Sequence, residues 1–170
     1  MYYVLALPLY RQDSYEEVMR HLVEGLRWQD QFRSSWSIPS KAGIYKARAR
    51  LGPTPMKELF NSVAKPLASP DNQGAFYRGL RLVVIDGTSL DVSDSPENLR
   101  HFSKPATPIG FAANAKARIV GLVECGTHTI FAAEVGPYSV SEQILARGVV
   151  PYLKTGMLCI ANRGLFGYEL

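Results

Sequence analysis

A carboxylate directly follows the most strand-like stretch of the chain. The apolar, β-branched run 82–85 precedes Asp86 and Gly87. Such a run predicts a strand that is buried on both faces. Asp86 is then expected where the strand gives way to a turn, at a sheet edge that a metal ion or ligand can reach. The simpler interpretation is that Asp86 and Gly87 only make the turn, as Asp-Gly does in many proteins.

Further charged groups follow this aspartate. Asp91 and Asp94 offer oxygen ligands of the kind that divalent cations prefer, although an ordinary Asx-rich loop explains them as well. The proline-containing stretch 95–110 is expected to be a loop, and it carries Arg100 and Lys104. These two cations could contact phosphate, or they could simply be solvated.

The most basic segment of the chain lies earlier, at residues 41–52. It contains Lys41, Lys46, Arg48 and Arg50 and no acidic residue. Ser40 before it and Gly52 at its end predict a capped helix. A basic helix after a short turn suits the recognition element of a helix-turn-helix, in which cations contact phosphates and a few side chains reach base edges. A solvated basic helix is the alternative.

Two more helices are expected in the N-terminal part. A capping box at residues 14–17, followed by apolar residues at helical spacing, predicts a helix over 15–28. Thr54-Pro55 begins another helix, whose apolar positions predict a core stripe: Met56, Leu59, Phe60, Val63 and Leu67. The turn-rich segment 69–74 then predicts a boundary, with a helical unit at residues 1–74 and a second domain at 75–170. The helical unit is expected to be a DNA-binding domain if its basic helix contacts DNA.

The second domain is predicted to combine a hairpin, a helix and another strand. Residues 115–125 and 128–135 read as two strands joined by a glycine-containing turn. A capping box at Ser139–Glu142 predicts the start of a helix. The apolar run 157–161 predicts a strand that ends at Asn162.

The composition is that of an ordinary globular protein. Of the 170 residues 46% are hydrophobic and 20% charged, and the net charge is +4. This mild basic excess permits nucleic-acid binding but does not establish it. The two cysteines are expected to be reduced, as in the cytoplasm, and no segment reads as a membrane span.

Three segments, 82–98, 123–128 and 161–170, resemble the insertion-sequence 4 family of bacterial transposases. The resemblance implies a DDE transposase with an RNase H-like catalytic domain, of which this chain would hold the first half. It places the first acidic ligand at Asp86, whereas the second acidic position is Asn162. The third, a glutamate, would lie beyond Leu170, which implies a truncated copy. The two strand ends would then lie side by side, with Asp86 beside Asn162.

The resemblance also implies a function and its partners. The family performs cut-and-paste DNA transposition at transposon ends with Mg2+ or Mn2+ as cofactor. Two-metal phosphodiester chemistry needs carboxylates around the scissile phosphate, so a chain with Asn162 and no third glutamate is expected to be catalytically impaired. The alternative is a non-catalytic DNA-binding or inhibitory fragment that associates with itself or with full-length transposase. A poorly folding remnant is the third possibility.

Overall fold

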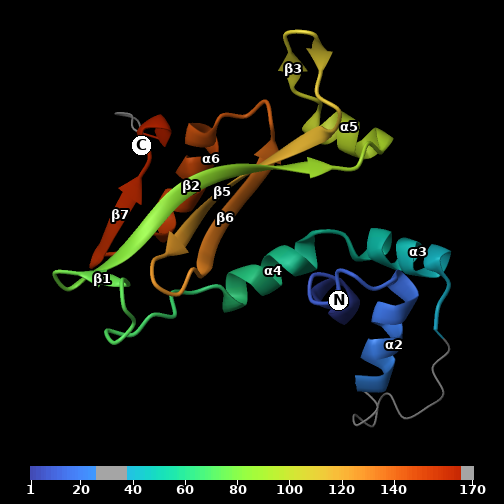
Figure 1. The fold of residues 1–170 in the computed structure, drawn as a ribbon, viewed down its shortest axis with the longest axis horizontal. Helices are drawn as coiled ribbons and strands as arrows, with labels where there is room; N and C mark the ends of the chain where they lie inside the picture. Colours follow the sequence, from blue (N-terminus) through green and yellow to red (C-terminus); the bar gives the residue numbers. More distant parts are fainter. Residues whose placement is uncertain (26–37, 166–170) are drawn as a thin grey trace. The chain divides into compact units, whose positions relative to one another are not determined.

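A computed structural model describes residues 1–25 and 38–165 of the chain (Figure 1). The chain folds into two compact units, Met1–Ser62 and Val63–Leu170. The boundary predicted from the sequence lies twelve positions later, at residue 74, and stays a prediction. Each unit has its own hydrophobic core and is described by itself.

The first unit is helical. Its elements are α1 (Tyr2–Ala6), α2 (Tyr15–Gly25), α3 (Lys41–Leu51) and α4 (Thr54–Val63). Its core joins α1, α2 and α3 through Tyr3, Ala6, Val18 and Ile44. The core stripe predicted for the helix after Thr54 is wrong, because α4 buries no residue. The N-terminal segment, itself folded into α1, provides the apolar partners of α2 and α3 instead.

Side-chain caps fix where two of these helices begin. The Ser14 hydroxyl accepts a hydrogen bond from the Glu17 amide at 3.3 Å, and the Ser40 hydroxyl accepts one from the Gly43 amide at 3.3 Å. Each bond satisfies a backbone donor that has no partner inside the helix. Both predicted caps are therefore confirmed. The last three positions of the predicted helix 15–28 lie outside the described residues.

The second unit is built on a mixed sheet. Its strands are β1 (Phe76–Tyr77), β2 (Leu80–Val92), β5 (Ala115–Glu124), β6 (Ile130–Pro137) and β7 (Met157–Ala161). Antiparallel pairing gives the order β1-β2-β5-β6, and β7 pairs with β2 in parallel (Figure 1). A parallel neighbour needs a crossover. Here the crossover contains α6 (Glu142–Val149) and the 3-10 helix η2 (Val150–Tyr152).

Helix α6 covers one face of this sheet. Alternate residues of β2 and β5, among them Val83, Ile85, Val120 and Leu122, pack against Ala146 and Val149 of α6. The 3-10 helix η3 (Arg163–Leu165), which follows β7, adds Leu165 to the same core. Because successive strand residues point to opposite faces, Asp86 points away from this core and is exposed.

Three local predictions are corrected by the structure. β2 does not end at Asp86 but continues to Val92, because β5 pairs with it along this whole length, with Asp86 opposite Gly121. The expected loop 95–110 contains the helix α5 (Pro96–Phe102) and the strands β3 (Ala106–Thr107) and β4 (Gly110–Phe111). The N-cap of α6 is Ser141, not Ser139.

The mixed α/β class predicted for the chain is confirmed. Strand, hairpin, helix and strand follow one another in the predicted order. Within the described ranges, no helix is long and apolar enough to cross a bilayer.

Candidate functional sites

Asp86 and Asn162 lie next to each other at the end of β7. The last pair of the parallel β2–β7 ladder is Ile85 with Ala161, so the following residue on each strand reaches the same edge. The side-chain nitrogen Nδ2 of Asn162 donates to Oδ1 of Asp86 at 3.0 Å. The sequence-based prediction that these two side chains are neighbours therefore agrees with the structure.

Both polar atoms of the Asn162 side-chain amide form hydrogen bonds. Its Oδ1 accepts hydrogen bonds from the backbone amides of Gly164 at 2.9 Å and Leu165 at 3.2 Å. The amide thus caps η3 with its oxygen and holds Asp86 with its nitrogen. Oδ1 of Asp86 also accepts from the Gly87 amide at 2.9 Å. Both side chains are exposed to solvent.

This donor set does not fit a two-metal centre. Divalent magnesium binds oxygens and prefers anionic ones, yet the Asn162 oxygen is used by two backbone amides and its nitrogen faces Asp86. In the described part of the chain, no group of three or more Asp, Glu, His or Cys side chains could hold a metal ion.

The other two aspartates of β2 and its following turn are neutralised by lysines. Asp91 pairs with Lys116 and Asp94 pairs with Lys104. The hydrogen bonds from these lysines lower the pKa of both carboxyl groups. Asp94 also accepts from the Ala115 amide at 3.0 Å. These carboxylates fasten the end of β2 to β5 and to the segment after α5.

Glu142, the first residue of α6, lies beside Gly87 of β2, on the face of the sheet opposite to Asp86. A side-chain carbon added to Gly87 would lie 2.7 Å from Cδ of Glu142. Gly87 and Asp86 are successive strand residues and point to opposite faces. Glu142 therefore packs on the α6 side, and a side chain at position 87 would require the Glu142 side chain to shift.

The basic segment forms an exposed helix in the first unit. Lys41, Lys46, Arg48 and Arg50 are all exposed on α3, and none of them forms an ion pair with another described residue. The Arg48 guanidinium lies over the Tyr15 ring, 5.9 Å from its centroid. Tyr45, on the same helix, is 72% exposed. α3 therefore presents positive charge and an aromatic ring to solvent.

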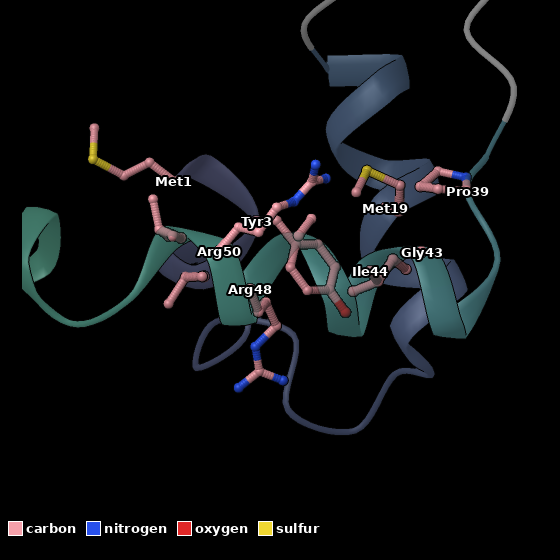
Figure 2. Close-up of a pocket in the computed structure, with 11 residues that line it drawn as sticks. Met1, Tyr3, Met19, Pro39, Gly43, Ile44, Arg48 and Arg50 are labelled. Carbon is pink, nitrogen blue, oxygen red and sulfur yellow. The ribbon is translucent and has the colours of Figure 1, made fainter.

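A pocket of about 480 Å³ lies beside this helix, within the first unit. Its wall combines α1, α2 and α3, and Figure 2 shows Tyr3 next to Ile44 among the lining residues. Arg48 and Arg50 belong to its lining. The Tyr3 hydroxyl donates to the backbone oxygen of Tyr15 at 3.4 Å, and burial raises the pKa of Tyr3.

The remaining two predicted DNA-binding residues lie in the second unit. Arg100 is exposed in the last turn of α5. Lys104 donates to the backbone oxygen of Ala113 at 2.7 Å in addition to its ion pair with Asp94. Lys104 therefore has a structural partner already, whereas Arg100 remains accessible.

One buried carboxylate was missed by sequence reasoning. Glu124, at the end of β5, has 0% exposure and pairs with Arg81. It accepts hydrogen bonds from the Leu67 amide at 2.9 Å and the Ala68 amide at 2.7 Å. These donors are more than fifty positions away in sequence, so no local pattern indicates the contact. Glu124 ties the segment after α4 to the sheet.

The first unit matches a known family. Residues 1–61 match the family model described as "Insertion element 4 transposase N-terminal". This range contains all of α3 and most of α4.

Two proteins of Escherichia coli K12 are similar to most of the chain. "Putative transposase InsZ" is 24% identical over 156 residues, which cover 91% of this chain and 52% of InsZ. "Transposase InsG for insertion sequence element IS4" is 26% identical over 129 residues, which cover 76% of this chain and 29% of InsG. The chain thus spans about half the length of one relative and less than a third of the other. No solved structure matches the chain significantly.

The chain is therefore similar to transposases, and its first unit is similar to the N-terminal region of insertion element 4 transposases. This similarity agrees with the resemblance read from the sequence motifs.

Proposed function

We propose that this chain binds DNA through α3 and does not cleave it. The observation that carries the proposal is the set of four exposed cations on α3 (Lys41, Lys46, Arg48 and Arg50), none of which is paired with a described acidic residue. Phosphate contacts by lysine and arginine supply most of the affinity of non-specific DNA binding. The relation to transposases supports DNA as the partner, with transposon ends as the preferred site.

The second unit would be an altered catalytic half of an RNase H-like DDE domain. The strand order and the meeting of Asp86 with Asn162 support this assignment. Cleavage would require Mg2+ or Mn2+ held by carboxylates. Asn162 supplies a neutral amide whose oxygen accepts from two backbone amides, so the residues at this edge do not fit the metal ions that cleavage requires.

DNA binding by α3 is tested with fluorescence anisotropy of a labelled duplex. The variant Lys46→Ala/Arg48→Ala/Arg50→Ala should bind roughly tenfold more weakly or worse at moderate salt. The slope of log affinity against log salt should become shallower by about 0.9 for each phosphate contact removed. The measurement should include one duplex with candidate transposon ends and one of random sequence.

A matched control removes three cations elsewhere. Lys65→Ala/Arg78→Ala/Lys154→Ala changes the net charge equally but leaves α3 intact. It should retain nearly the wild-type affinity. Equal losses in both triple variants would mean that overall charge, and not α3, attracts the DNA. Unchanged binding by the α3 variant would refute the proposal.

A further inference from the structure

We propose that Asn162 takes the place of a metal ion at the β2–β7 edge. Its amide would hold the Asp86 carboxylate and the turn into η3 together, so that the edge is complete without a divalent cation. This inference goes beyond DNA binding: it uses the pairing of positions 86 and 162 and does not depend on what α3 contacts.

The orientation of the amide follows from its partners. Two backbone N–H groups, of Gly164 and Leu165, face one end of it, and a carboxylate oxygen of Asp86 faces the other. Turning the amide over would set nitrogen against two donors and oxygen against a carboxylate. All three hydrogen bonds would then be lost.

One oxygen of the Asp86 carboxylate already has two hydrogen-bond donors. Its Oδ1 accepts from both the Gly87 amide and Asn162. A cation approaching this oxygen would meet the partly positive amide nitrogen of Asn162 at close range. It would gain a single carboxylate as ligand, whereas Mg2+ needs near-octahedral coordination by oxygens. The wild-type edge should therefore have little affinity for divalent cations.

A carboxylate at position 162 should instead give this edge affinity for a divalent cation. One of its oxygens can still accept from Gly164 and Leu165, so η3 keeps its cap. The other oxygen replaces the amide nitrogen and faces Oδ1 of Asp86, across a separation that is 3.0 Å in the wild-type chain. Two carboxylates at this distance repel, and a divalent cation between them relieves the repulsion. Asn162→Asp should thus lower stability and create cation dependence.

The test uses the full chain without DNA, which separates it from the proposed function. Binding of Mn2+ is measured by electron paramagnetic resonance of the free ion, and the melting temperature is recorded with and without Mn2+. The wild type, Asn162→Asp and the exchanged pair Asp86→Asn/Asn162→Asp are compared. The exchanged pair has one carboxylate and one amide at the edge, as the wild type does.

Asn162→Asp should bind Mn2+ about 10- to 100-fold more tightly than the wild type. Mn2+ should raise its melting temperature by about 3 °C. The wild type and the exchanged pair should show no specific binding and no shift. Mn2+ binding by the wild type that Asp86→Ala abolishes would overturn the inference, as would equal Mn2+ responses in all variants. The wild-type comparison decides the question even if Asn162→Asp fails to fold.

Discussion

Asn162 donates a hydrogen bond to Asp86 across two parallel strands, although the two residues are 76 positions apart in the chain. The contact exists because β7 ends beside the middle of β2, so the residue after β7 meets the strand that continues past it. This edge of the sheet carries one amide and one carboxylate, not two carboxylates. The edge therefore has less negative charge than a divalent cation requires.

The first prediction concerns the ion pair between the buried Glu124 and the half-buried Arg81. Glu124→Gln should lower the free energy of unfolding by about 2 kcal/mol or more, because the amide loses the ion pair and must turn its NH2 group toward donors, either Arg81 or the backbone amides. Urea unfolding followed by circular dichroism measures the change. Glu58→Gln, at an exposed position on α4, is the control and should have almost no effect. Similar stability in both variants would contradict the role given to Glu124.

The second prediction is a loss of stability in acid. Burial pushes the pKa of Glu124 up, but hydrogen bonds from Thr127, Leu67, Ala68 and Arg81 outweigh it, and the net pKa lies below the usual 4.5. Its stabilising effect is therefore present above pH 4.5 and is lost as the pH falls through the lowered value. Urea midpoints should fall across this window. The fall should be smaller in Glu124→Gln, and identical profiles would disprove the assignment.

The third prediction separates two serines near the start of α6. The Ser141 hydroxyl accepts from the Ile144 amide at 3.3 Å, whereas Ser139 is exposed before the helix. Ser141→Ala should cost about 1 kcal/mol of stability because it removes the cap. Ser139→Ala should be nearly neutral in the same urea measurement. The opposite ranking would restore the capping box predicted from sequence.

The order of elements could be predicted from sequence because the signals are local. Ser14 and Ser40 precede periodic apolar runs, and both hydroxyls cap helices as expected. The contact between Asp86 and Asn162 was implied by the resemblance to the transposase family, whose fold places these two strands side by side. α5 was missed although Ser95 followed by Pro96 is a recognisable helix start, with Ser95 accepting from the Asn98 amide.

Other features depend on contacts that the sequence does not display. Asp86-Gly87 reads as a turn by itself, but β5 supplies a partner on both sides of it and the chain stays extended. Glu124 accepts hydrogen bonds from backbone amides of a distant segment. Because almost every residue has a backbone amide, the residue types do not indicate this contact. The Asn162 amide could have coordinated a cation through its oxygen. Only the geometry of η3 shows that this oxygen is used.

The proposed activity of the chain is DNA binding without cleavage. The most direct test incubates the wild-type chain with supercoiled plasmid that carries candidate transposon ends, in Mg2+ and separately in Mn2+, and examines retardation and nicking on one gel. We expect retarded plasmid that stays supercoiled after the protein is removed. Nicking by the wild type that Asp86→Ala abolishes would contradict it and show that this edge is catalytic.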